Sequence, residues 1–145
     1  MKIQIITVGA PKLGYAKAGW QEYTTRLKHY HQLQLTHIAD KHNDAEHILS
    51  AITGNGAVYV VALTITGKQY TSRELASFLD NKAQQGRELC FIIGGPDGLP
   101  RAVLSRAEQE LGLSNLTFPH DLAMVVLAES LYRASTINNN QNYHH

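Results

Sequence analysis

Two hydrophobic patterns alternate along the chain and predict alternating strands and helices. Unbroken or alternating apolar residues are typical of strands, whereas apolar residues three or four positions apart, such as Ala16, Trp20, Tyr23 and Leu27, are typical of one helix face. The patterns predict strands over residues 2–8, 33–38, 57–63, 89–93 and 115–118. They predict helices over residues 15–28, 45–52, 71–86 and 121–136, and another that begins near Pro100. This alternation indicates an α/β fold with a mostly parallel sheet flanked by helices.

The apolar run from Leu89 to Ile93 is the strand around which we expect the others to be arranged. An apolar run without polar positions is typical of a strand that is buried on both faces. It ends directly in Gly94 and Gly95, followed by a Pro-Asp-Gly turn. Open α/β sheets bind ligands at the carboxyl ends of their strands. Residues 94–98 are therefore either a ligand-binding turn or an ordinary connection between a strand and a helix.

The last predicted helix is unusually apolar, because residues 122–128 form a run of seven apolar residues. A helix on the surface of a monomer carries polar residues at regular intervals. This helix is therefore either buried on all sides or in contact with a partner, and we expect a homodimer built on it.

The composition indicates a globular chain of one domain, residues 1–145. Of its 145 residues, 43% are hydrophobic and 17% are charged, and this length is sufficient for one core. No stretch is long and apolar enough for a transmembrane helix, and residues 1–4 begin a strand pattern instead of a signal peptide. The single cysteine, Cys90, favours a reducing, cytoplasmic compartment. Because the net charge is only +1, binding to RNA would require a local basic patch.

The sequence lacks several common catalytic and ligand-binding signatures. It contains no P-loop, no dinucleotide-binding glycine motif, no G-x-S-x-G motif and no H-E-x-x-H motif. Five histidines fall in or beside predicted surface segments without paired cysteines or regular ligand spacing, namely His29, His31, His37, His42 and His47. We interpret them as polar surface residues and predict no metal site.

Three features near the C-terminus have residue types that could carry chemistry. His120 follows a Phe-Pro pair, so it either caps the last helix or lies at the same sheet edge as Gly94. Glu129 and Arg133 have the spacing of an ion pair within a helix, although Arg133 could equally face a partner or an anionic ligand. The chain ends in a tyrosine and two histidines, residues 143–145, which is unusual for a frayed terminus.

Four motifs, in this order, resemble one known family. They are FIIGGPDG at residues 91–98, LTFPH at 116–120, LAESLYRA at 127–134 and YH at 143–144. Residues 2–5, 8–9 and 63–68 match it as well. In these segments the chain resembles the ribosomal RNA large subunit methyltransferase H family, which consists of small SPOUT-class enzymes that methylate N3 of a pseudouridine in 23S rRNA. The likeness covers nearly the whole chain.

The resemblance implies a fold, a cofactor and an assembly. It implies a SPOUT fold with a deep trefoil knot near the C-terminus, a homodimer, and S-adenosylmethionine as methyl donor. By the matching motifs, Leu63 would lie at the first cofactor loop and Gly94 at the second. The third loop would comprise Leu113, Ser114, Asn115, Leu116, Thr117 and Phe118. Apolar surface and backbone contacts suit this donor, because it has no phosphates.

The resemblance also implies which residues act on the substrate, 23S rRNA within the ribosome. Methylation of N3 requires removal of its proton. The tail residues Tyr143 and His144 would reach the site from the other protomer. We expect His144 or His120 to accept the proton or to organise a water molecule, and Arg133 to position the RNA.

Two positions depart from the family's pattern. The family usually has arginine where this chain has Met124, and a basic residue where it has His145. Both changes remove positive charge from the region expected to meet RNA. Two other functions therefore stay open: a SPOUT methyltransferase that acts on tRNA or another RNA, and a cofactor-binding, ribosome-associated protein without catalysis.

Overall fold

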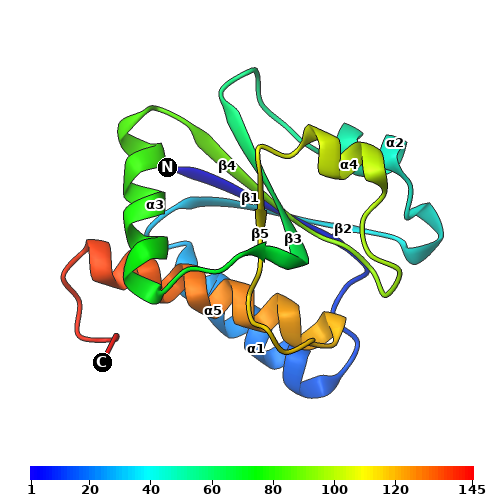
Figure 1. Cartoon of the computed structure of the whole chain (residues 1–145). Coiled ribbons are helices and arrows are strands. Elements are labelled where there is room, and N and C mark those ends of the chain that lie inside the picture. The colour runs from blue at the N-terminus through cyan, green and yellow to red at the C-terminus, as the bar shows by residue number, and fades with distance from the viewer.

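Five strands form one parallel sheet in the order β2–β1–β4–β3–β5 (Figure 1). The computed structural model describes residues 1–145. The strands are β1 (Lys2–Val8), β2 (Gln32–Ile38), β3 (Val58–Lys68), β4 (Glu88–Ile93) and β5 (Gln109–Leu111). A helix lies in each connection between consecutive strands, as parallel pairing requires. The predicted α/β fold with a parallel sheet and flanking helices is confirmed.

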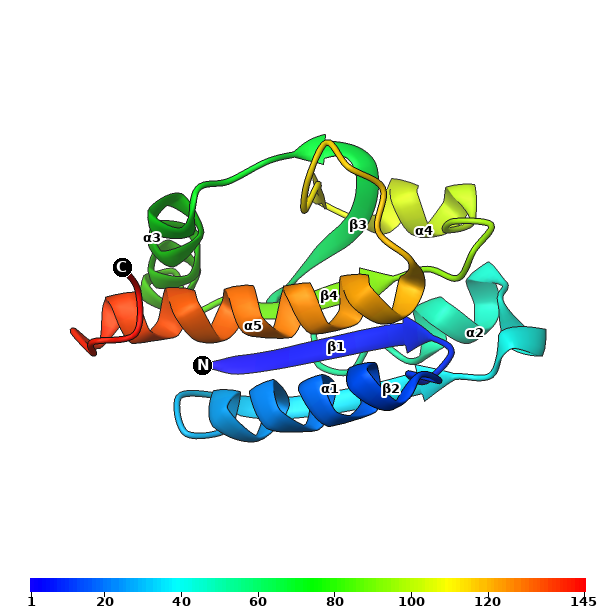
Figure 2. The same ribbon diagram turned by 90° about the horizontal axis from the view of Figure 1, so that it is seen from below.

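The helices form two layers, one on each face of the sheet (Figure 2). The first layer contains α1 (Gly14–Leu27), α3 (Ser72–Gln84) and α5 (His120–Asn138). The second contains α2 (Ala45–Ser50), which follows the short 3-10 helix η1 (Asp40–His42), and α4 (Arg101–Arg106). Each layer covers its own hydrophobic core, so both faces of the sheet are buried.

Burial on both faces explains why the central strand β4 is apolar at every position from Leu89 to Ile93. Leu89, Phe91 and Ile93 pack in the core beneath α1, α3 and α5, whereas Cys90 and Ile92 pack in the core beneath α2 and α4. Every position is thus apolar because successive side chains point to opposite, equally covered faces. Burial also raises the pKa of the Cys90 thiol to about 12, which keeps it protonated.

A capping box opens α3. The Thr71 hydroxyl accepts a hydrogen bond from the Glu74 backbone N–H (3.1 Å), and the Glu74 carboxylate accepts one from the Thr71 N–H (2.9 Å). This reciprocal pair satisfies two backbone donors that a helix end leaves free. Gly86 follows the helix with a φ of +68°, a backbone conformation that favours glycine.

The apolar helix α5 is buried on one side only. Met124, Leu127, Ala128, Leu131 and Ala134 belong to the core between α1, α3 and the sheet. Leu122, Ala123, Val125 and Val126 are only half-buried in the single chain. Complete internal burial therefore does not account for the whole apolar run. No helix of the protein has the length and hydropathy needed to cross a bilayer.

The predicted strand at residues 115–118 is wrong. The fifth strand lies earlier, at Gln109–Leu111, and residues 112–119 form an irregular connection to α5. The alternation of Leu116 and Phe118 with polar residues resembles a strand pattern, but residues 115–118 pair with no strand, and the place beside β3 is taken by β5. Leu116 instead points to solvent and is 74% exposed.

Leu111 lies across a bend in β3 and is paired with β3 at both ends of the bend. Leu111 pairs with Leu63 and also with Lys68, so the intervening residues of β3 bulge around it. The Gly112 N–H then donates a hydrogen bond to the Lys68 carbonyl (3.0 Å). A Cβ on Gly67 would lie 2.5 Å from the Leu111 carbonyl carbon and 2.6 Å from the Gly112 nitrogen. Only glycine fits at this crossing.

His31 joins the turn between α1 and β2 to α5. The Ser135 hydroxyl donates to the Leu131 carbonyl (2.8 Å), so its oxygen accepts the hydrogen bond from His31 Nε2 (2.8 Å). The other ring nitrogen of His31 is buried without a partner. Burial, together with the positive N-terminus, lowers the pKa of His31 from 6.5 to about 4. The folded protein thus holds this imidazole neutral.

We predict that Gly67→Ala destabilises the protein by about 2 to 3 kcal/mol, because the added methyl group meets backbone that cannot move aside. The free energy of unfolding in urea measures this loss. Gly14→Ala is the matched control, since a Cβ there meets no atom within 4 Å. If both variants unfold at the same urea concentration, the crossing is not tightly packed.

We predict that His31 makes the protein less stable as the pH falls from about 6.5 to about 4. In this window the unfolded chain binds a proton at His31 and the folded protein does not, so protonation favours unfolding. His31→Gln should reduce the difference between the urea midpoints at neutral and acid pH. The exposed His29, changed to Gln, should leave that difference intact, and an equal effect of both changes would contradict the assignment.

Candidate functional site

Three segments meet at the carboxyl edge of β3 and β4. Ala62 pairs with Ile92, so Leu63 and Gly94 follow at nearly the same level on neighbouring strands. On its other side Leu63 pairs with Leu111, which leads into residues 113–118. The structure therefore brings together the three segments that the sequence motifs single out.

Residues 113–118 are tied to the bend in β3. Gln69 Nε2 donates a hydrogen bond to Asn115 Oδ1 (2.6 Å), and the Leu116 N–H donates to the Ser114 hydroxyl (3.0 Å). Leu113 packs against the larger core, whereas Leu116 stands out into solvent. Ile65, in the bend, is also 65% exposed. Two large apolar side chains thus remain uncovered beside this edge.

A small cleft opens beside the third segment. Its volume is about 60 Å³, and Leu113, Gly112 and Leu111 line it together with Tyr70 and Leu127. Pockets for ligands of drug size usually have several hundred Å³. The cleft is thus a fraction of the space that such a ligand needs.

Gly94 has a structural role in its own turn. A Cβ at this position would lie 2.9 Å from the Gly98 carbonyl carbon and 3.0 Å from the Leu99 side chain. The Gly98 N–H donates to the Gly95 carbonyl (3.0 Å) and closes the turn, and Gly98 has a φ of +79°. A larger residue at 94 would disturb the turn itself, so it would not isolate a contact with a ligand.

A polar cluster lies at the carboxyl end of β1, where α5 begins. The buried Asp121 carboxylate accepts hydrogen bonds from the backbone N–H groups of Lys12 (2.8 Å) and Leu13 (2.7 Å). Burial alone would raise the pKa of Asp121, but these bonds and the adjacent His120 hold it below its ordinary value. Asp121 therefore fixes the loop between β1 and α1 against α5, a contact that the sequence did not reveal.

His120 lies in this cluster, at the same edge of the sheet as Gly94. Its Cε1 is 3.7 Å from the position of a Cβ on Gly9, just after β1. Its Nδ1 is 3.5 Å from Asp121 Oδ1, and its Nε2 is buried without a partner. The helix is not capped by a His120 side-chain hydrogen bond, because Pro119 occupies the N-cap position. Of the two alternatives for His120, the structure shows the placement at the sheet edge.

The C-terminal tail folds back onto the last turns of α5. The Tyr143 hydroxyl lies 3.1 Å from Glu129 Oε1 and 3.4 Å from the Tyr23 hydroxyl. Arg133 donates to Glu129 (3.0 Å) and to His144 Nδ1 (3.3 Å), and its guanidinium lies 4.8 Å from the Tyr143 ring centroid. The predicted pair of Glu129 and Arg133 is confirmed. Burial and the two neighbouring groups raise the pKa of Tyr143, so it stays protonated.

His120 lies far from the other candidate catalytic residues. Thirteen residues of continuous helix separate His120 from Arg133, which amounts to about 20 Å. Figure 2 shows the start of α5 at the carboxyl end of β1 and the tail at the opposite end, near the N-terminus. Within one chain, Arg133, Tyr143 and His144 are together, and His120 and Gly94 lie at the other edge of the sheet.

The two departures from the family pattern lie in different environments. Met124 is completely buried and belongs to the larger core. Our expectation that Met124 removes positive charge from an RNA-facing surface is wrong for the single chain, because its side chain reaches no surface. His145 is exposed at the terminus.

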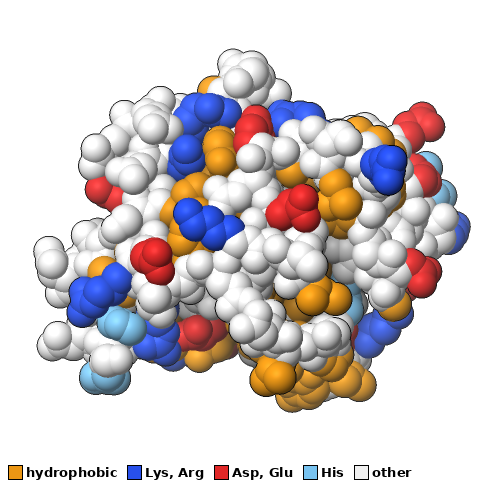
Figure 3. Space-filling model, in the orientation of Figure 1, with side chains coloured by type: hydrophobic (Ala, Val, Ile, Leu, Met, Phe, Trp, Pro, Cys, Tyr) orange, Lys and Arg blue, Asp and Glu red, His pale blue; other side chains and the backbone are white.

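A basic hollow lies between the end of β3 and α3. It has a volume of about 380 Å³, and its lining includes two cations, Lys68 and Arg73, and one carboxylate, Glu74, beside Tyr70 and Phe78. Figure 3 shows Lys and Arg side chains gathered around hydrophobic ones on this part of the molecule. A second apolar area, at the lower edge in Figure 3, lies over the starts of α1 and α5, where Leu13 and Tyr15 are exposed.

The five histidines interpreted as surface residues are not equivalent. His31 is largely buried, and His37 lies between Trp20 and the Thr7 hydroxyl, with its pKa lowered by burial and by His120. His42 and His47 stack on each other. His29, His37 and His47 are exposed, as interpreted, whereas His31 and His42 are partly buried.

Comparison with known proteins gives a consistent result. Residues 1–144 match the family model described as a predicted SPOUT methyltransferase. The chain is 46% identical to the ribosomal RNA large subunit methyltransferase H of Deinococcus deserti and 42% identical to that of Bacillus pumilus, with 99% of each chain covered. Its fold is similar to that of a probable methylase family protein from Haemophilus influenzae, with a TM-score of 0.61 at 15% identity over 99% of this chain and 70% of that one.

Proposed function

The chain belongs to the ribosomal RNA large subunit methyltransferase H family of SPOUT methyltransferases, and we propose that it methylates N3 of a pseudouridine in 23S rRNA with S-adenosylmethionine as donor. The observation that carries this proposal is the meeting of Leu63, Gly94 and residues 113–118 at one sheet edge. These are the segments that the family motifs assign to the cofactor. A ribosomal substrate would place the protein in the cytoplasm.

The residues at this edge fit a ligand with apolar parts and no phosphates. Leu116 and Ile65 offer exposed apolar surface for a nucleoside, and the irregular backbone of residues 112–119 offers hydrogen-bonding groups that no strand uses. We infer that residues 113–118 move outward to admit the cofactor, because the cleft beside Leu113 is far smaller than the ligand. When bound, S-adenosylmethionine supplies an electrophilic methyl group.

We propose that the fold contains the family's trefoil knot at the bend of β3. Support comes from Leu111, which is paired with both ends of the bend at Leu63 and Lys68, and from the close backbone contact of Gly67 and Gly112. Residues 111–112 thus lie against a nearly closed loop of chain. The same crossing holds the first and third cofactor segments together.

We propose that the active unit is a homodimer in which each tail serves the other protomer. A single chain places Tyr143 and His144 at the opposite end of α5 from Gly94 and His120. Two copies related by a twofold axis with their α5 helices antiparallel would bring each tail to the partner's carboxyl edge. The half-buried face of α5 and the exposed Leu13 and Tyr15 offer apolar surface for this contact.

The tail residues differ in whether they can accept a proton. Tyr143 stays protonated, so it cannot act as a base at neutral pH and instead positions Glu129. His144 Nδ1 accepts a hydrogen bond from Arg133, so His144 can take up a proton there only after this bond breaks. A phosphate that binds Arg133 would break it. We therefore assign the proton acceptor or organiser of water to His144, and RNA positioning to Arg133.

His120 remains the alternative proton acceptor. Its buried Nε2 has no partner and lies at the cofactor edge, but its surroundings are less open to a bulky base. The basic hollow at Lys68 and Arg73 offers the local positive charge that a net charge of +1 does not supply. No feature of the site favours tRNA over ribosomal RNA.

We predict that His144→Ala lowers the rate of methyl transfer by about 100-fold or more, the contribution of a general base, while the affinity for S-adenosylmethionine stays nearly unchanged. Ribosomes that lack the modification are the substrate, nucleoside mass spectrometry detects the product, and calorimetry measures cofactor binding. His29→Ala is the control and should keep the full rate. An equal loss of rate and affinity would refute the tail's catalytic role, and methylation of tRNA alone would refute the substrate.

We predict that Asn115→Ala weakens S-adenosylmethionine binding by about twofold to tenfold, the equivalent of one net hydrogen bond, because the third segment loses its link to Gln69. Gln84→Ala is the matched control, since it removes a similarly exposed hydrogen bond to Asp80 on α3. Calorimetric titration of both variants is the measurement. Unchanged affinity in Asn115→Ala would show that the pocket does not depend on this link.

A further inference from the structure

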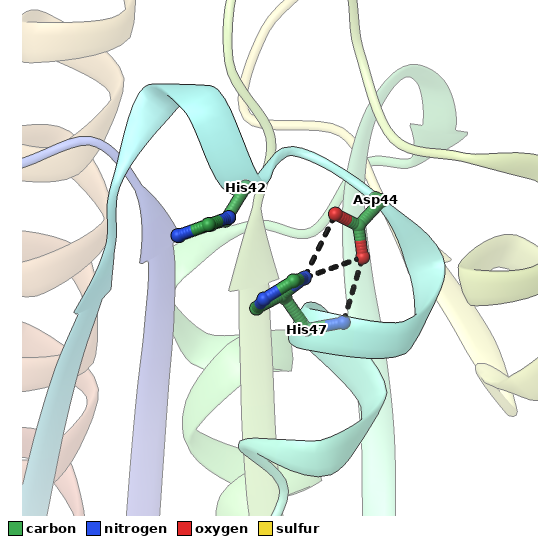
Figure 4. Close-up of side chains that lie close together, drawn as sticks. All are labelled: His42, Asp44 and His47. Atoms are coloured by element: carbon green, nitrogen blue, oxygen red, sulfur yellow. Dashed lines mark hydrogen bonds and ion pairs between the residues drawn. The ribbon is translucent and has the colours of Figure 1, made fainter.

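His42, Asp44 and His47 form a compact cluster of potential metal ligands, away from the cofactor segments in sequence. One ligand atom from each lies within 4.8 Å of the other two. His42 ends η1, Asp44 is the N-cap of α2, and His47 is in the first turn of that helix (Figure 4). The sequence spacing H-x-D-x-x-H alone did not distinguish these residues from scattered surface groups.

The carboxylate of Asp44 organises the cluster. It accepts a hydrogen bond from the His47 backbone N–H (2.8 Å), and both of its oxygens lie 2.8 Å from His47 Nδ1. The imidazole rings of His42 and His47 stack with their centroids 4.1 Å apart and their planes 14° apart. The side chains of Asp44 and His47 are each 48% exposed, so an ion from solvent can reach them.

The backbone that carries these side chains is fixed. The Asp44 N–H donates to the His42 carbonyl (2.8 Å), and the Ile48 N–H donates to the Asp44 carbonyl (3.1 Å). Ile48 is completely buried in the core beneath α2 and α4. The three ligands thus project from an anchored turn, and a metal ion would not have to order a flexible loop.

The distances are compatible with coordination. Two ligands at about 2.0 to 2.1 Å from one ion lie about 2.8 to 3.4 Å apart at right-angled or tetrahedral geometry. The His47 Nδ1 to Asp44 separation of 2.8 Å already falls at this value, so an ion could replace the shared proton. Coordination by both imidazoles requires rotation of the side chains, which would unstack the nearly parallel rings and close the widest separation of up to 4.8 Å.

The donor set determines the class of metal. The cluster offers the imidazoles of His42 and His47 and the carboxylate of Asp44. Two imidazoles and one carboxylate suit zinc and its neighbours in the transition series, whereas magnesium and calcium prefer oxygen ligands alone. We propose that His42, Asp44 and His47 bind one divalent cation of the zinc class, with solvent in the remaining position.

The site would brace the segment beside the central turn. Asn43 lies between the ligands in sequence, and its side-chain nitrogen is 3.7 Å from the position of a Cβ on Gly95. An ion that joins η1 to α2 therefore restrains the wall next to residues 94–98. Its role is structural, and it does not depend on the proposed methyl transfer.

The test is a titration of the full-length, tag-free protein with zinc chloride, followed by calorimetry and by thermal unfolding. We expect one ion per chain and a higher unfolding temperature. His42→Gln and His47→Gln should each weaken binding by at least about tenfold, as loss of a metal-bound imidazole or its support does. Asp44→Asn, which keeps an oxygen for the N-cap, should weaken it as well.

Two control variants test whether zinc binds at this cluster or at other histidines. His29→Gln should bind zinc like the wild-type protein. The double change His144→Gln and His145→Gln removes the imidazoles of the tail and should also leave the affinity unchanged. Loss of binding in that double variant, or wild-type affinity in His42→Gln and Asp44→Asn, would overturn the proposal.

Discussion

The crossing of residues 67 and 112 is the constraint on which the rest of the C-terminal half depends. At this point two backbones approach so closely that neither residue can carry a side chain without displacing the other. The contact fixes where the chain leaves β5, and therefore how residues 113–118 and α5 lie against the sheet. The placement of the candidate cofactor segments follows from this steric requirement together with the strand pairing and the hydrogen bond between Gln69 and Asn115.

Much of the fold could be predicted because its elements have strong local signals. The capping box at Thr71 and the pair of Glu129 and Arg133 arise from interactions within a few residues, and the burial of β4 on both faces leaves a continuous apolar run at Leu89–Ile93. The strand predicted at residues 115–118 is wrong because alternation describes only the side chains, whereas a strand also needs backbone pairing with a neighbour, and here β5 pairs with β3 instead. The buried position of Met124 and the Asp121 contacts with the loop before α1 depend on long-range packing, which no local pattern reveals.

Some features of the candidate site could likewise be predicted from the sequence, and others could not. Family motifs identified residue types, and parallel pairing places Leu63 and Gly94 together because neighbouring strands end at a common edge. The length of α5, in contrast, separates His120 from the tail, and a sequence carries no direct signal of that distance. Because groups at opposite ends of one rigid helix cannot meet within a single chain, the homodimer that we propose would give the apolar face of α5 a role beyond burial.

The position of α5 at the end of the chain has a consequence for biosynthesis. This helix supplies Met124, Leu127, Ala128, Leu131 and Ala134 to the larger core, and it is translated after all five strands of the sheet. Until it emerges, the face of the sheet between α1 and α3 lacks its cover, so the nascent chain cannot complete its fold stepwise from the N-terminus. A product truncated before residue 120 would therefore expose an open core, and we expect cellular proteases to recognise it as unfolded.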